Sequence, residues 1–417
     1  MRIIHTSDWH LGRRLYGQAR YQEFAHFLNW LSDYIADNHI DALLIAGDVF
    51  DSNSPSNRAQ NLYYEFLNKV AHSCCQHIVI ISGNHDSPSF LSAPKALLKD
   101  LNIHIVAQLT DNLEDEVIAL HNTQGELAAL VCAVPYLHDR DIRSSQAGES
   151  LADKEDKLKT AIQHHYQQVV NIAEQQRHDY MKQQPTTTYI PIIAMGHLFT
   201  AGGKTQEGDG VRDLYVGSLA HIHASFFPDN IDYLALGHLH IPQRIAQSNT
   251  QRYSGSPLAM SFGEAKQQKI IVDIQFNPND KSANINEIAI PCFQQLLKIR
   301  GDLTEILAKL EKLILDNTDS WLEIIYTGKH LHSDLSKQVH AALQSNTQHK
   351  LKILRIENKA LITHALSASQ YGHKTLEELS PQQVFQRCLD ANNIPCSQQP
   401  ELVTSFAEIL LATEYLK

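Results

Sequence analysis

The sequence lacks several features that mark specialised classes of protein. Its 417 residues include only six cysteines, and none has the Cys-x-x-Cys spacing of zinc fingers or redox motifs. The longest apolar stretch, around Leu127 to Leu137, is shorter than the ~18 residues of a membrane-spanning helix, and Asp8 interrupts the beginning of the chain before a signal-type apolar segment can form. We therefore expect reduced cysteines and a location in the cytoplasm.

Basic charge is scarce as well. The chain carries 35 lysines and arginines against 46 aspartates and glutamates, a formal net charge of −11. Proteins that bind nucleic acid through their overall electric field usually have a basic face, so this charge argues against that mode of binding. It does not exclude a nuclease, because bound divalent metals add local positive charge and a partner subunit can supply a basic surface.

The length and the hydrophobic pattern predict two or three domains. Short apolar runs alternate with amphipathic helical patterns up to about Phe276, which is typical of an α/β protein. A polar, turn-rich segment at 277–280 predicts that a first domain, residues 1–278, ends there. Alternating strand and helix patterns then predict a small α/β domain over 279–372, followed by a helical tail over 373–417.

Polar clusters follow the ends of five predicted strands. They are Asp8-Trp9-His10, Gly47-Asp48-Val49-Phe50-Asp51, Gly83-Asn84-His85-Asp86, Gly196-His197 and Gly237-His238-Leu239-His240. In an open α/β sheet the carboxyl ends of the strands form the crevice where ligands bind. Carboxylate, amide and imidazole groups suit Mn, Fe or Zn, and a glycine before such a residue lets the backbone turn sharply or approach an ion or phosphate. The clusters therefore predict a metal centre.

The order of these motifs, DxH, GDxxD, GNHD, GH and GHxH, resembles that of the calcineurin-like metallophosphoesterases. The forms TSDWHLG, AGDVFD, SGNHD and GHLH resemble the members of that family that serve as nuclease subunits. The resemblance implies a four-layer α/β/β/α sandwich, a smaller α/β domain that caps the active site, and two divalent metal ions, commonly Mn²⁺.

The resemblance also implies a role for each motif residue. The ligands are one shared carboxylate and three further side chains for each ion: Asp48 as the bridge, Asp8, His10 and His240 for the first ion, and Asn84, His197 and His238 for the second. His85 corresponds to the catalytic histidine rather than to a ligand. It would act as a general acid toward the departing 3′ oxygen, with Asp86 as its orienting partner.

A Mn²⁺-dependent DNA nuclease is the function that the resemblance implies. It would act as an exonuclease on duplex ends and as an endonuclease on hairpins and single strands. The expected partner is an ATPase with long coiled coils, the nuclease chains would form a homodimer, and the helical tail is the candidate docking element.

Some residues near the motifs admit two interpretations. Asp51 is suited equally to a turn with Ser52 and Asn53 and to supporting Asp48. Arg13 and Arg14 are suited equally to solvated loop charges and to contacts with DNA phosphates, and we leave them out of the site.

Three further patterns are not expected to carry function. We predict that the neighbouring pair His164 and His165 is solvated on a helix surface. His221-Ile222-His223 has no preceding glycine, and Gly203-Lys204-Thr205 lacks the glycine spacing of an ATP-binding loop.

Rival functions remain at this stage. A protein phosphatase is disfavoured because such enzymes usually have GDxxDRG and RGNHE, whereas Ser52 and Asn53 follow Asp51 here. A small-nucleotide phosphodiesterase would have little use for the second domain. A catalytically idle scaffold should have lost some of the ligands, yet every expected position carries a suitable side chain.

Overall fold

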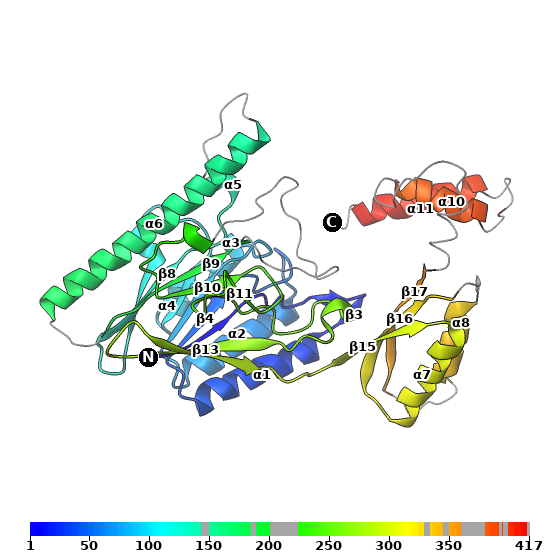
Figure 1. Cartoon of the computed structure of the whole chain (residues 1–417), viewed down its shortest axis with the longest axis horizontal. Helices are drawn as coiled ribbons and strands as arrows, with labels where there is room; N and C mark the ends of the chain where they lie inside the picture. Colours follow the sequence, from blue (N-terminus) through cyan, green and yellow to red (C-terminus); the bar gives the residue numbers. More distant parts are fainter. Residues whose placement is uncertain are drawn as a thin grey trace. The chain divides into compact units, whose positions relative to one another are not determined.

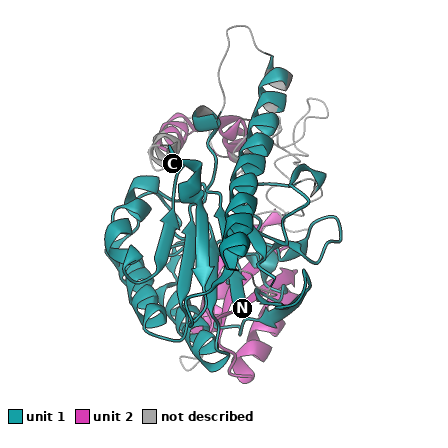
Figure 2. Ribbon diagram, turned by 90° about the vertical axis from the view of Figure 1, so that its left-hand side faces the viewer, with its two compact units in different colours: residues 1–293 teal, residues 294–417 magenta. Residues whose placement is uncertain are grey.

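The structure is a computed structural model in which residues 1–142, 150–184, 189–200, 224–328, 334–344, 350–359, 380–391, 394 and 399–414 are described. The chain divides into two compact units, residues 1–293 and 294–417, which Figure 2 colours separately.

Two six-stranded sheets form the first unit. The first sheet contains, in spatial order, β14 (Ala283–Ala289), β13 (Ile270–Phe276), β1 (Arg2–Thr6), β4 (Ala42–Ala46), β5 (His77–Ile81) and β6 (Ile103–Val106). The second contains β11 (Gln243–Arg244), β12 (Gln251–Tyr253), β10 (Tyr233–Gly237), β9 (Ile192–His197), β8 (Leu127–Ala133) and β7 (Val117–His121). β1, β4, β5 and β6 run parallel, and all residues of β4 and β5 are buried, as expected for parallel strands covered on both faces.

Helices cover the outer faces of both sheets. α1 (Tyr21–Asp37) and α2 (Asn57–Ala71) share an apolar core with the first sheet, and α6 (Leu151–Gln183) shares one with the second. A third core, with Val79 and Met195 among its members, fills the space between the sheets. Figure 1 shows α6 and the α1–α2 pair on opposite sides of the strands. The predicted α/β/β/α sandwich is confirmed.

Shorter elements complete the first unit. They are the hairpin β2 (Arg14–Leu15) and β3 (Gln18–Ala19), the helices α3 (Pro88–Ser92), α4 (Lys95–Lys99) and α5 (Asp139–Ile142), and the 3₁₀ helices η1 (Leu113–Glu116), η2 (Ala224–Phe226) and η3 (Phe262–Glu264).

The predicted domain boundary at residue 278 falls in a turn. Asn277 N–H donates to the Ser282 carbonyl at 2.9 Å, and this turn connects β13 with β14. β14 pairs with β13 along its whole length and is the edge strand of the first sheet, so the first unit continues to Phe293. The edge strand alternates polar and apolar residues, ANINEIA, which is why its sequence resembles a linker more than a buried strand.

The second unit has the strand–helix alternation that the sequence predicts. Its parallel sheet is ordered β15 (Gln295–Gly301), β16 (Ser320–Tyr326), β17 (Lys352–Asn358), and α7 (Leu303–Leu315) and α8 (Leu335–Gln344) follow the first two strands. Asp302 and Glu305 form a capping box at the start of α7. The tail contains α10 (Pro381–Ala391) and α11 (Gln399–Glu414), whose Phe385 and Phe406 rings stack at 4.0 Å.

Within the described ranges, no helix combines the length and the low polarity that crossing a membrane would require.

The prediction for the His164–His165 pair is wrong for one of its members. His164 is exposed, but His165 is buried on α6 and its Nε2 lies 2.7 Å from Oε2 of the fully buried Glu116. Glu116 ends η1, almost fifty residues earlier in the chain, so the pairing depends on a tertiary contact that helix periodicity does not reveal.

A buried histidine connects the two sheets. His5 on β1 places Nδ1 3.0 Å from the Tyr233 hydroxyl and Nε2 3.2 Å from the Leu236 carbonyl, both on β10. Because its side chain is fully buried, the pKa of His5 falls to about 3. The folded state therefore holds this ring neutral, whereas the unfolded chain binds a proton below a pH of about 6.5.

We expect this difference to make stability depend on pH. His5 contributes fully above a pH of about 6.5, and its contribution falls by about 1.4 kcal/mol per pH unit below that value until the folded pKa is reached. His5→Gln should lower the free energy of unfolding, and this decrease should be about 2 kcal/mol smaller at pH 5 than at pH 8. Urea titrations of both proteins in EDTA would measure this, and an equal loss at the two pH values would contradict the assignment.

Candidate metal centre

Each predicted cluster follows or ends a strand of the sandwich. Asp8 and His10 follow β1, Asp48 follows β4, and Asn84 and His85 follow β5 in the first sheet. In the second sheet His197 is the last residue of β9, and His238 and His240 follow β10. The carboxyl ends of these strands meet, as the sequence predicts, and each of the eight side chains contacts at least one of the others.

The backbone of four of these residues is strained. Asp8, His10, Asp48 and His238 have φ values of 54°, 48°, 51° and 104°, a region that residues other than glycine rarely adopt. Each such conformation costs roughly 1–3 kcal/mol and persists only where surrounding contacts impose it. Here Asp8 N–H donates to the Gly47 carbonyl and His10 N–H to the Asp48 carbonyl, both at 3.0 Å.

Two glycines of the motifs are required because the strand ends lie so close together. A Cβ on Gly83 would lie 2.1 Å from Oδ1 of Asp48, and a Cβ on Gly237 would lie 1.9 Å from the Ala46 carbonyl oxygen. The expected close approach is present, but the atoms approached belong to the protein itself. These glycines let the loops after β4, β5 and β10 come together.

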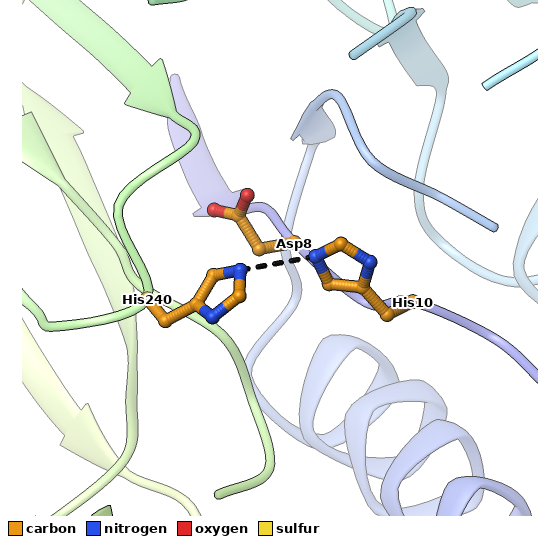
Figure 3. Close-up of side chains that lie close together, drawn as sticks. All are labelled: Asp8, His10 and His240. Carbon is orange, nitrogen blue, oxygen red and sulfur yellow. Dashed lines mark hydrogen bonds between the residues drawn. The ribbon is translucent and has the colours of Figure 1, made fainter. Parts of the chain in front are cut away.

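Asp8, His10 and His240 form the first group of ligand-type side chains (Figure 3). All three are buried, and their nearest ligand atoms lie within 4.8 Å of one another. His10 Nε2 lies 3.0 Å from His240 Nε2, so the two rings point at each other. Only one proton can lie between two such nitrogens, whereas a cation would accept the lone pairs of both.

Asp48 lies between this group and the second. Its Oδ2 is 3.5 Å from His10 Nε2 and 3.3 Å from His197 Nε2. Its Oδ1 accepts the backbone N–H of His85 at 2.9 Å, which fixes the plane of the carboxylate. One oxygen of Asp48 is thus directed at both halves of the cluster.

Asn84 and two histidines make up the second group. Asn84 Oδ1 lies 3.1 Å from His197 Nε2 and 2.9 Å from His238 Nδ1. His197 Nδ1 donates to the Ala46 carbonyl at 2.9 Å, an arrangement that orients Nε2 toward Asp48. The backbone N–H of His238 donates to Asp8 Oδ1 at 2.9 Å, which connects the second group to the first.

The electrostatics of the cluster favour a cation. Burial raises the pKa of Asp8 to about 7 and lowers that of His238 to about 3. Burial would also lower the pKa of His197, but the charge of Asp48 outweighs it and raises that pKa to about 9. Burial also lowers the pKa of His10 and of His240, so two buried carboxylates lie beside three imidazoles that resist protonation. Divalent ions would supply positive charge there in place of protons. The residues present fit a centre of this kind.

His85 has surroundings that suit a proton donor. Its Nδ1 lies 3.0 Å from the Asp51 carbonyl, its ring centroid is 4.8 Å from that of His10, and its side chain is half-buried. A carbonyl accepts only a donated proton, so Nδ1 carries the hydrogen and Nε2 is the nitrogen left for exchange with a substrate.

The suggested pairing of Asp86 with His85 is wrong. The buried Asp86 carboxylate accepts three backbone N–H groups, those of Val49 at 3.1 Å, Phe50 at 2.9 Å and Gly83 at 2.9 Å. It therefore fixes the loop that carries Asp48 against the loop that carries His85, and the partner that orients His85 is the Asp51 carbonyl.

The structure favours a supporting role for Asp51. Its Oδ1 lies 3.2 Å from the Arg13 guanidinium and 3.5 Å from His10 Nδ1, while its carbonyl contacts His85. Arg14 is exposed, and its Nε donates to the Gly17 carbonyl at 2.9 Å within the hairpin. The patterns at His221–His223 and Gly203–Thr205 lie outside the described residues.

Sequence reasoning missed two residues that donate hydrogen bonds to the proposed ligands. Ser7 donates to Asp8, and Lys269 donates to the His240 carbonyl. A serine beside a motif and a single lysine before an apolar strand are too common to attract notice, so the sequence offers no signal for them.

Comparisons with known proteins agree with this geometry. Residues 1–242 match the family described as calcineurin-like phosphoesterase, and residues 292–393 match the family described as type 5 capsule protein repressor C-terminal domain. The chain is 36% identical over 413 residues, 98% of each chain, to the SbcD subunit of nuclease SbcCD from Escherichia coli strain K12. It is 34% identical over 316 residues to the SbcD subunit from Bacillus subtilis strain 168, and the match covers 75% of this chain and 76% of the relative. It is 32% identical over 325 residues, 76% of each chain, to the SbcD subunit from Rhodobacter capsulatus.

Proposed function

Because the chain belongs to the calcineurin-like phosphoesterases and, among them, to the family of SbcD subunits of nuclease SbcCD, we propose that it is the Mn²⁺-dependent nuclease subunit of an SbcCD-type complex. Family membership makes it a metal-dependent phosphodiesterase and nuclease. Its proposed reactions are exonucleolytic degradation of duplex ends and endonucleolytic cleavage of hairpins and single strands during DNA repair, recombination and replication. Such work on chromosomal DNA would take place in the cytoplasm.

One observation carries the proposal. Eight side chains from five separate segments meet in one mostly buried cluster, and Asp48 faces a histidine of each of its two groups. The proposed ligands are Asp8, His10 and His240 for the first ion, Asn84, His197 and His238 for the second, and Asp48 for both. When bound, two divalent ions would polarise the phosphate and activate a water molecule for in-line attack.

The chain's own residues would supply the remaining chemistry. Attack by water forms a new phosphorus–oxygen bond while the bond to the 3′ oxygen breaks, and that oxygen needs a proton. We propose that His85 donates it from Nε2 in its imidazolium form, which carries a hydrogen on each ring nitrogen, while the Asp51 carbonyl holds the Nδ1 hydrogen. The proton that the attacking water releases balances the one that His85 gives up. The half-buried position of His85 gives this ring access to a substrate, whereas the proposed histidine ligands are buried.

The partner belongs to the proposal as well. The relatives are named as subunits of SbcCD, and we propose an SbcC-like ATPase with coiled coils as the partner and a homodimer of this chain within the complex. The net charge of −11 supports a partner that supplies the basic surface for DNA. α10 and α11 are the candidate docking element.

The test compares substrates under one set of conditions. The chain, alone and co-expressed with the neighbouring ATPase gene, is incubated in Mn²⁺ or EDTA with a labelled DNA hairpin, bis-nitrophenyl phosphate or a phosphopeptide. We expect the hairpin to be cut at least about 100-fold faster in Mn²⁺ than in EDTA, because the metals supply the nucleophile and the charge stabilisation. Turnover of the phosphopeptide without cleavage of DNA would support a protein phosphatase and overturn the proposal.

A further inference from the structure

The backbone of His240 is held by residues to which the proposed chemistry gives no role. His240 lies three residues beyond β10, outside any strand. Its carbonyl oxygen accepts the Ser256 N–H at 3.1 Å and Lys269 Nζ at 3.0 Å. The Ser256 hydroxyl donates to the Leu258 carbonyl at 2.9 Å and accepts from Lys269 Nζ at 3.1 Å. Two donors on one carbonyl fix the peptide next to the imidazole that faces His10 (Figure 3).

The turn that provides these donors is shaped to lie against His240. Gly255 has φ +74°, and a Cβ there would lie 2.8 Å from the His240 carbonyl oxygen and 2.7 Å from the Pro242 ring. Only glycine combines this conformation with so close an approach. The serines before and after Gly255, Ser254 and Ser256, therefore both lie close to the site.

Lys269 is buried beneath this turn with all its partners inside the protein. Its side chain is 7% exposed, and its ammonium group contacts the fully buried carboxylate of Glu264 as well as the Ser256 hydroxyl at 3.1 Å. Removing two charges from water is costly, so a buried ion pair contributes little to net stability. A role in fixing the His240 peptide accounts for this pair better than stability does.

The same turn also reaches Asp8. Ser254 Oγ lies 2.9 Å from Ser7 Oγ, and Ser7 Oγ donates to Asp8 Oδ2. Ser7 and Ser254 are both fully buried, which protects these hydrogen bonds from competition with water. The turn at 254–256 thus supports two of the three side chains in Figure 3.

We propose that Ser254, Gly255, Ser256 and Lys269, here called the cradle, are positioning residues that set the affinity for the first of the two ions. The inference rests on the proposed function, because it requires the two-ion site. The hydrogen bonds of the cradle lead to Asp8 and His240, whereas His197 is oriented by the Ala46 carbonyl. Partners that orient metal ligands typically change metal affinity by about 10- to 100-fold when they are removed.

The test removes the ammonium group without leaving a buried charge unpaired. Lys269→Met alone would strand the Glu264 carboxylate, so the informative protein is the double variant Glu264→Gln with Lys269→Met, which replaces the pair by neutral groups of similar size. Lys266→Met is the matched control, because Lys266 is exposed three residues earlier. Equilibrium dialysis with metal analysis gives the number of bound Mn²⁺ ions and their affinities.

We expect the double variant to bind one ion at least about tenfold more weakly and the other within about twofold of the wild type. The weakened ion should be the one that His240→Ala loses. Adding His240→Ala to the double variant should then still leave one tightly bound ion, whereas adding His238→Ala should leave only the weakened ion. Ser256→Ala, which removes only one hydroxyl group of the cradle, should weaken the same ion by about threefold.

Unchanged affinities in the folded double variant or in Ser256→Ala would overturn the cradle, and so would an equal weakening of both ions. A wild-type chain that fails to bind two ions would instead contradict the proposed function, whatever the variants do. The two failures are therefore distinguishable.

Discussion

Asp48→Ala should remove both metal ions together and lower DNA cleavage by at least about a thousandfold, which corresponds to about 4 kcal/mol of transition-state stabilisation. The physical reason is the position of one oxygen. Oδ2 of Asp48 lies 3.5 Å from His10 Nε2 and 3.3 Å from His197 Nε2, so this one oxygen faces a histidine of each group. Removing it takes a negatively charged ligand from both proposed ions.

Metal analysis after dialysis, together with the hairpin assay, measures this effect. Asp37→Ala is a suitable control, since Asp37 is an exposed carboxylate at the end of α1. Loss of only one ion in Asp48→Ala would contradict the shared position of this residue.

His85→Gln is expected to separate binding from chemistry. The variant should retain both ions, because His85 is not among the proposed ligands, while cleavage falls by roughly 10²- to 10⁴-fold for lack of a proton donor. A glutamine amide can still donate to the Asp51 carbonyl that holds Nδ1 in the wild type, so the loop should keep its conformation.

The measurement combines Mn²⁺ content with single-turnover cleavage. His26→Gln provides the control, because His26 is an exposed histidine on α1. If His85→Gln lost an ion, the residue would be a ligand; if it cleaved DNA at the wild-type rate, it would have no part in the mechanism.

The sequence predicts that the candidate site residues lie together, because they occur in short motifs. Asp8 and His10, or His238 and His240, are two residues apart, and each motif follows an apolar run of strand length, so local pattern and topology together place them at one edge of the sheets. The sandwich is predictable for the same reason, since buried strands are continuous apolar runs.

The contacts that support the site are not predictable in this way. Asp86 follows His85 directly, but its carboxylate accepts hydrogen bonds from Val49 and Phe50, which are more than thirty residues away. Lys269 reaches His240 from the far end of a loop. Such contacts depend on how distant segments pack, and a single sequence carries no record of that packing.

The cluster combines buried charge with a strained backbone. Burial raises the pKa of Asp8 to about 7, and four site residues have left-handed backbones, so the cluster without cations is costly to maintain. Binding of divalent ions would recover part of this free energy, because a ligand that binds only the folded state stabilises it.

The most direct test is diffraction from crystals soaked in MnCl₂, recorded at a wavelength where manganese scatters anomalously. Two anomalous peaks should appear, both within bonding distance of Asp48, one also bonded to Asp8, His10 and His240 and the other to Asn84, His197 and His238, with His85 bonded to neither. A single peak, or peaks away from Asp48, would contradict the account.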